Sequence, residues 1–99
     1  MKVAIQVRHF LTPAGRRAFG RVIREHHRLA SARPGFISLR RLTPANPARP
    51  EEVDVVVEFE SLRRLMEWRR SPGHDRIAAA YARCWSRPPE ARFFNVKEF

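Results

Sequence analysis

The segment VDVVVEFESLRRLMEWRRSPGH, Val53–His74, holds the pattern that decides the fold. It begins with valine and phenylalanine that alternate with mostly acidic residues, and this period of two predicts a strand with one apolar face. Ser61 can then cap a helix, and Ser71 followed by Pro72 can start another. A serine side chain accepts hydrogen bonds from first-turn N–H groups, and proline suits the first helical position. The segment therefore predicts a strand that leads into a helix broken near Ser71.

The residues before this segment predict a strand and a capped helix. Residues 3–10 alternate with the same period of two, which indicates a strand. Thr12 is the expected cap and Pro13 the first helical residue. Apolar side chains at helical spacing extend this helix to about Ala32.

A turn, a second strand and a loop are predicted next. Pro34-Gly35 ends the helix, and Phe36–Leu42 indicates a short strand. The following residues, TPANPARP at Thr43–Pro50, include three prolines and are expected to form a loop. We expect the strands on either side of this loop to pair.

The C-terminal part predicts the end of the broken helix and a last strand. An inward helical face continues from Ile77 to Cys84, Pro88-Pro89 is expected to end the helix, and Arg92–Phe99 indicates a strand. The resulting order predicts an α+β fold, a ferredoxin-like βαββαβ plait that forms a single domain over residues 1–99. Its four-stranded antiparallel sheet would be covered on one face by helices.

The second face of such a sheet has no helix to cover it. Val56, together with Ile37 or Leu39, supplies apolar side chains for both faces, so an exposed apolar patch is expected. We therefore expect a homodimer through the sheet face, which would bury the patch.

Composition favours one small domain and argues against several classes of protein. A chain of 99 residues with 43% hydrophobic content is large enough for one core. The single cysteine, Cys84, cannot form an intramolecular disulfide, and no cysteine and histidine spacing is typical of zinc. A reducing, cytoplasmic setting without a metal site is expected. The apolar segments are too short for a signal peptide or a membrane span.

The net charge of +10 would attract an anionic partner. Eighteen of the twenty basic residues are arginine, and those at positions 17, 21, 24 and 28 fall on one side of the predicted helix. They form either a solvated face or a stripe that follows phosphates. The RNA-recognition motif has the same element order, but the acidic residues of the Val53–Glu60 strand would repel phosphate. We therefore expect no nucleic-acid partner.

Four parts of the sequence together resemble the antibiotic biosynthesis monooxygenase family of dimeric α/β-barrel proteins. They span nearly the whole chain: Leu11-Thr12-Pro13, Pro34-Gly35-Phe36, Phe59-Glu60-Ser61 leading into Leu65 and Trp68, and Ser71–His74. The resemblance implies two plaits packed sheet to sheet as a homodimer, with a pocket in each subunit between helices and sheet. Some members oxidise aromatic, polyketide-like phenols to quinones with oxygen and without metal or flavin, whereas others degrade haem.

The family's marker positions count against haem degradation. The haem-degrading branch has an asparagine where this chain has Val7 and a histidine where it has Ala78. The quinone-forming branch shares Trp68, but its tyrosine and asparagine correspond here to His74 and Arg64. The resemblance therefore implies a cofactor-independent monooxygenase that acts on a small aromatic compound. The alternative is a non-enzymatic dimeric barrel that binds such a ligand.

Two histidines are candidate catalytic residues. His74 lies near the start of a helix, where the positive end of the helix dipole favours a neutral imidazole that can accept a phenolic proton. His9 shares a strand face with Val7 and could point into the same pocket. Each could instead be a surface or structural histidine.

Five residues are candidates for binding the substrate. Trp68 could stack on a flat ring, Tyr81 could orient a ligand through its hydroxyl, and His26 lies on the apolar side of its helix. Val7 and Phe59, on inward strand faces, complete the predicted pocket. A packing role in the core is the alternative for each.

Overall fold

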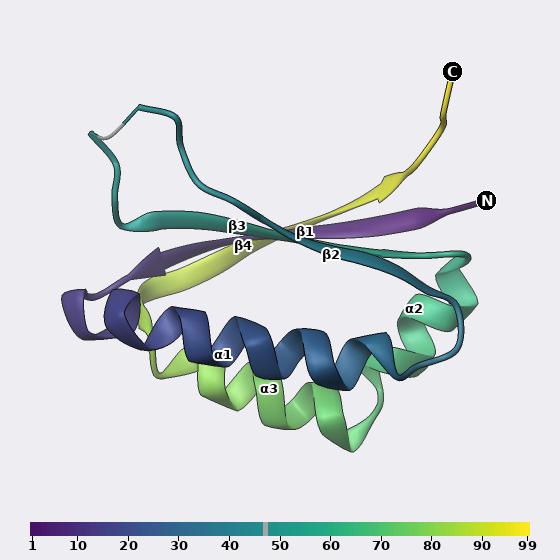
Figure 1. The fold of residues 1–99 in the computed structure, drawn as a ribbon, viewed down its shortest axis with the longest axis horizontal. Helices are drawn as coiled ribbons and strands as arrows, with labels where there is room; N and C mark the ends of the chain where they lie inside the picture. The colour runs from purple at the N-terminus through teal and green to yellow at the C-terminus, as the bar shows by residue number, and fades with distance from the viewer. Residues whose placement is uncertain (47) are drawn as a thin grey trace.

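In the described part of the chain, four strands form one antiparallel sheet, and three helices cover one of its faces (Figure 1). The computed structural model describes residues 1–46 and 48–99. Its elements are β1 (Val3–Leu11), α1 (Pro13–Ser31), β2 (Phe36–Leu42), β3 (Glu52–Phe59), α2 (Leu62–Arg69), α3 (Pro72–Ala82) and β4 (Trp85–Asn95). The strand order across the sheet is β2-β3-β1-β4. The predicted ferredoxin-like α+β fold is confirmed, including the break in the second helix.

Each helix begins at the cap that the sequence predicts. The side chains of Thr12, Ser61 and Ser71 each accept a hydrogen bond from the backbone N–H three residues later, at 2.9, 3.2 and 3.2 Å. A cap of this kind contributes about 1 kcal/mol. Ser71 Oγ also donates to the carbonyl of Trp68 at 2.6 Å. One residue therefore ends α2 and begins α3.

The turn before β2 depends on a glycine. Gly35 has a φ of 83°, in the left-handed region that side chains disfavour. A Cβ at this position would also lie only 2.9 Å from Cβ of Arg64. The Gly35 carbonyl accepts a hydrogen bond from Glu60 N at 2.8 Å, which ties the start of β2 to the end of β3.

The last strand begins earlier than the sequence predicts. α3 ends at Ala82 and β4 starts at Trp85. The predictions of a helix that reaches Pro88-Pro89 and of a strand over Arg92–Phe99 were therefore wrong in their bounds. β4 lies at the edge of the sheet, and a proline is tolerated there because its missing N–H can face away from the ladder.

A bulge accommodates the two prolines within β4. Arg8 pairs with Glu90, and Phe10, two residues further along β1, pairs with Arg87, three residues earlier on β4. β4 thus carries one residue more than β1 across the Pro88-Pro89 step. An extra residue of this kind bends the strand and re-aims its side chains.

One hydrophobic core fills the space between the sheet and the helices. Its largest fully buried side chains are Phe19, Val55, Phe59 and Leu65. The four arginines at positions 17, 21, 24 and 28 of α1 are all exposed on the side away from this core. None of the described helices combines the length and the apolar character that crossing a membrane requires.

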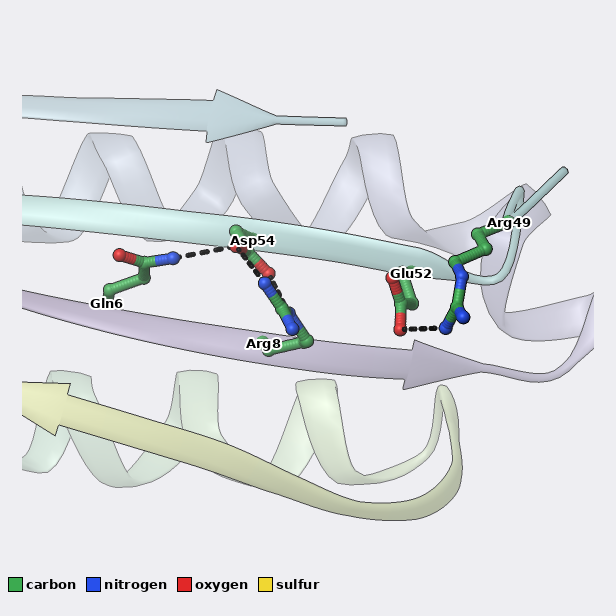
Figure 2. A network of polar contacts seen from close by, with 5 residues as sticks. All are labelled: Gln6, Arg8, Arg49, Glu52 and Asp54. Atoms are coloured by element: carbon green, nitrogen blue, oxygen red, sulfur yellow. Dashed lines mark hydrogen bonds and ion pairs between the residues drawn. The ribbon is translucent and has the colours of Figure 1, made fainter. Parts of the chain in front are cut away.

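The open face of the sheet carries a polar network. Asp54 on β3 accepts hydrogen bonds from Gln6 Nε2 at 2.7 Å and from Arg8 Nε at 2.9 Å, both on β1. Figure 2 shows this group beside a second ion pair, in which Arg49 Nη1 lies 3.4 Å from Glu52 Oε1. The network pairs opposite charges along the two central strands.

Apolar side chains occupy only part of the open face. Ala4, Phe10 and Val56 are buried between their neighbours, and Phe94 on β4 is 37% exposed. Leu39 pairs with Val57 and therefore faces the helices. The face is thus a mixture of charged and apolar side chains, and the exposed apolar area that the sequence pattern predicts is limited to part of it.

Two segments rise on the open-face side of the sheet. The predicted loop Thr43–Pro50 joins β2 to β3, and it stands above the sheet at one end (Figure 1). Its Pro47 lies outside the described residues. The chain after β4 rises on the same side at the other end.

A backbone contact joins the first turn of α1 to the start of β4. Gly15 is buried, and a Cβ there would lie 2.7 Å from Cα of Cys84 and even closer to its carbonyl oxygen. The same carbonyl accepts a hydrogen bond from Thr12 N at 3.0 Å. Only a residue without a side chain allows this approach.

We predict opposite effects for two glycine substitutions in α1. Gly15→Ala should lower the free energy of unfolding by about 1–3 kcal/mol, because its methyl group meets backbone that cannot move aside. Gly20→Ala is the matched control, since its Cβ would approach only the Arg24 guanidinium, at 3.5 Å. It should stabilise by about 0.5–1 kcal/mol through helix propensity. Urea unfolding measures both, and equal effects would contradict the contact.

Candidate functional site

A pocket of about 180 Å³ lies between the helix-facing side of the sheet and helices α1, α2 and α3. Its aliphatic wall comes mainly from β1, β3 and α3. Its lining residues are Ile5, Val7, His9, His26, Val55, Val57, Trp68, Arg69, His74, Ile77, Ala78, Tyr81, Trp85, Pro89 and Ala91. Among the described residues, the lining therefore combines an aliphatic wall with three imidazoles and the Arg69 guanidinium, and it contains no carboxylate.

Six of the seven predicted site residues line this pocket: Val7, His9, His26, Trp68, His74 and Tyr81. Phe59 does not. It is fully buried in the core, with its ring 5.8 Å from that of Phe36. Val55 and Val57, which lie earlier on the same face of β3, line the pocket instead because Phe59 is at the far end of the strand.

Trp68 is one of two indoles that line the pocket. It is 2% exposed, and its ring stacks on His26 with centroids 5.8 Å apart and an interplanar angle of 16°. The His74 ring meets it edge to face at 5.5 Å. Gly73 completes the support, since a Cβ there would lie 3.4 Å from the Trp68 ring. Two imidazoles therefore fix the plane of the indole.

His26 is held by Tyr81. Its Nδ1 lies 2.7 Å from the Tyr81 hydroxyl, and both side chains are buried. Burial lowers the pKa of His26 to about 3, so the ring is neutral at pH 7. Burial also raises the pKa of Tyr81 well above its ordinary value, so the phenol keeps its proton. The pair is a hydrogen bond between two neutral groups.

His9 is held by Trp85, a residue that the sequence prediction missed. Trp85 Nε1 donates to His9 Nδ1 at 2.9 Å. Burial lowers the pKa of His9 to about 4, so this imidazole is also neutral at pH 7. Trp85 was missed because Pro88-Pro89 was taken to end a helix. The sequence signal for Trp85 is that an aromatic residue directly follows Cys84, which ends the predicted inward helical face.

His74 differs from the other two histidines. Its backbone N–H is engaged by the Ser71 cap, but its imidazole forms no hydrogen bond within the described residues. The ring is only partly buried. Partial burial and the nearby Arg69 guanidinium lower its pKa, against a smaller opposing effect of Asp75. His74 therefore has a free lone pair beside Trp68.

The positions compared with the family branches lie in different surroundings. Val7 and Ala78 both line the pocket with apolar side chains. Arg64 lies outside it and pairs with Glu67 at 3.3 Å and with Glu60 at 3.7 Å. Of the compared positions that differ from the family branches, only His74 therefore contributes a polar side chain to the pocket, and the other polar groups lie at positions outside that comparison.

A larger cleft of about 610 Å³ lies at the end of the sheet, between α1 and the β2–β3 loop. Four arginines, at positions 16, 17, 41 and 49, line it together with Glu52. It contains none of the predicted site residues. We therefore place the candidate site in the smaller pocket, where the aromatic and imidazole groups converge.

Comparison with known families gives one match. The family described as Antibiotic biosynthesis monooxygenase matches residues 2–80. The chain therefore belongs to the antibiotic biosynthesis monooxygenase family. Comparison with curated proteins finds none that matches.

Solved structures share the fold over almost the full chain. Rv0793 from Mycobacterium tuberculosis has a TM-score of 0.84 at 20% identity, covering 100% of this chain and 98% of its own. SnoaB from Streptomyces nogalater, a cofactor-independent oxygenase, has a TM-score of 0.76 at 16% identity, with 99% and 95% covered. NE2512 from Nitrosomonas europaea, a protein of unknown function, has a TM-score of 0.79 at 19% identity, with 99% and 91% covered. At these identities the likeness concerns the fold alone.

We predict that burial of His26 makes folding sensitive to acid. Its pKa is about 3 when folded and 6.5 when unfolded, so the unfolded chain binds the proton first as the pH falls. Stability is therefore lost from about pH 6.5 downward, by about 2 kcal/mol between pH 7 and pH 5.

The variant His26→Phe/Tyr81→Phe removes both partners of the buried hydrogen bond together. It should lose about 2 kcal/mol less than the wild type over this pH interval. Urea unfolding at both pH values measures the difference. An unchanged pH dependence would mean that His26 is not held neutral in the folded protein.

Proposed function

We propose that this member of the antibiotic biosynthesis monooxygenase family oxidises a small aromatic phenol to a quinone with molecular oxygen and without a cofactor. For a naphthol, one oxygen atom enters the ring and the other leaves as water with the two hydrogens that the substrate loses. The substrate supplies all the electrons. The single observation that carries the proposal is a neutral imidazole without a hydrogen bond among the described residues, next to an indole in a pocket that fits an aromatic ring.

The proposed base is His74. A phenol reacts with oxygen far more readily as its electron-rich anion, so the first step is removal of the phenolic proton. His74 has an unengaged lone pair, and burial beside Arg69 lowers its pKa, which keeps it able to accept a proton at neutral pH. In His9, by contrast, the Trp85 N–H already occupies Nδ1. We therefore assign proton removal to His74 and a supporting role at the ligand oxygen to His9.

Trp68 is proposed to hold the ring. Its indole lines the pocket and is held by His26 and His74, so a flat ligand can pack against it without first ordering the side chain. Val7 and Val55 supply apolar contacts on the sheet side. Positioning of this kind lowers the barrier because the reacting ring is already oriented.

We predict that His74→Ala lowers the rate of oxygen consumption with 1-naphthol or anthrone by about 100-fold or more, because a general base is lost. An oxygen electrode and the quinone absorbance measure the rate. The exposed His27 of α1 provides the matched control, and His27→Ala should keep the wild-type rate. Equal rates for wild type and His74→Ala, both at background level, would contradict the proposed chemistry.

The pH dependence follows from the same assignment. Because His74 acts as the neutral imidazole and its pKa is lowered, the rate should fall only when the pH drops below about 6.5. The fall should be absent in His74→Ala. If ligands bind but no oxygen is consumed at any pH, the chain is a binding protein instead.

We also propose a homodimer through the open face of the sheet. Phe94, which pairs with Ala4 and is 37% exposed, leaves apolar area on this face at the β4 edge, and a second copy would cover it. Phe94→Glu should shift the sedimentation coefficient from that of a dimer to that of a monomer. The control, Ala79→Glu on the exposed side of α3, should remain a dimer. A wild-type monomer at micromolar concentration would contradict this interface.

A further inference from the structure

The pocket contains a buried nitrogen that the chain itself does not satisfy. His26 is 7% exposed, and its Nε2 has no hydrogen-bond partner within the described residues. Buried polar groups are nearly always paired in folded proteins, since an unpaired one costs about 1–3 kcal/mol. His26 also lines the pocket, so a ligand bound there is the candidate for the missing partner.

The Tyr81 hydroxyl decides which nitrogen of His26 carries the proton. A phenol has one proton to donate, and His26 Nδ1 is the only hydrogen-bond partner of this hydroxyl in the described part of the chain. The O–H therefore donates to Nδ1, and the proton of the neutral imidazole is on Nε2. His26 therefore carries an N–H donor that no described residue accepts.

Trp85 decides the tautomer of His9 in the same way. An indole N–H can only donate, so Nδ1 of His9 must be the acceptor. The proton of this neutral ring is again on Nε2, which no hydrogen bond among the described residues engages. Two imidazoles that line the pocket thus carry N–H donors, each fixed by an aromatic partner: Tyr81 is buried and Trp85 is partly buried.

We propose that His9 and His26 form a pair of N–H donors that bind an oxygen of the aromatic ligand and stabilise it as an anion, with Trp85 and Tyr81 as positioning residues. This inference rests on the proposed aromatic substrate and specifies its class. The ligand carries a phenolate or carbonyl oxygen on its ring. Fixed donors of this kind stabilise a developing negative charge without reorganising during the reaction.

The size of the pocket limits the ligand further. A cavity of roughly 150 Å³ accommodates benzene, so one of about 180 Å³ suits one ring or two fused rings. Donors on one side and the Trp68 face on another select a flat, small molecule with an acceptor oxygen. Naphthols fit this description better than three-ring anthrones.

The test uses a ligand that cannot be oxidised by the proposed reaction. Chromone is a flat bicyclic ketone without a phenolic proton, and naphthalene is its counterpart without an acceptor oxygen. Trp68 and Trp85 are the only tryptophans of the chain and both line the pocket, so their fluorescence reports binding. The wild type should bind chromone at least tenfold more tightly than naphthalene.

Two variants separate donation from packing. In His26→Phe/Tyr81→Phe, chromone binding should weaken roughly tenfold while naphthalene binding changes less than about twofold. The carbonyl stretch of bound chromone, measured by infrared difference spectroscopy, should move toward its value in the free ligand. The control His27→Phe should leave both ligands unchanged. Equal weakening of both ligands would overturn the donor role.

Nitrogen NMR tests the positioning residues directly. Long-range ¹H–¹⁵N spectra should show His9 and His26 as Nε2–H tautomers in the wild type, and Tyr81→Phe should mix the tautomers of His26. A wild-type Nδ1–H tautomer at His26 would overturn the inference. Because chromone is not oxidised, these results do not depend on oxygen uptake. The experiments can therefore contradict the proposed donor pair while supporting the proposed oxidation, or the reverse.

Discussion

The contact between Gly15 and Cys84 is the constraint on which the rest of the pocket depends. At this point the first turn of α1 meets the start of β4, and the Cys84 carbonyl accepts the Thr12 N–H at 3.0 Å. Trp85 is the next residue, so its direction is set by this joint. The axis of α1, which carries His26, starts from the same joint. Both imidazole hydrogen bonds therefore depend on a backbone approach that only glycine permits.

Burial, more than neighbouring charges, determines the protonation states of the pocket histidines. The chain carries a net charge of +10, yet the two most buried histidines are neutral because burial penalises the imidazolium form. No carboxylate lines this pocket to restore their charge. Its two most buried imidazoles are N–H donors without being cations, and Arg69 is the cationic side chain among the described lining residues. The pocket therefore attracts a polar oxygen while its walls accept an apolar ring. The arginines concentrate elsewhere, on α1 and around the larger cleft.

Local patterns predict most of the fold, and contacts between distant elements account for what they miss. The sequence predicts the helix caps Thr12, Ser61 and Ser71 correctly, because the cap hydrogen bond depends only on residues of the helix's first turn. The prediction that Pro88-Pro89 ends a helix was wrong. Whether a proline ends an element depends here on its place at the sheet edge and on a bulge opposite β1. Period-two alternation gives the face of Phe59 but not its distance along the strand from the pocket. The tautomers of His9 and His26 are set by partners 76 and 55 residues away, which no local pattern contains.

The break between α2 and α3 has a consequence for how such a site can change over evolutionary time. Trp68 and His74 are six residues apart, and on one continuous helix they would point about 120° away from each other. The Ser71 cap redirects the chain, so both rings meet at 5.5 Å. The four residues 70–73 that make this break lie outside the main hydrophobic core cluster. Substitutions confined to these four residues would change the angle between the Trp68 and His74 rings while the sheet stayed intact. Natural selection can therefore adapt the pocket to a different aromatic ligand through this short segment.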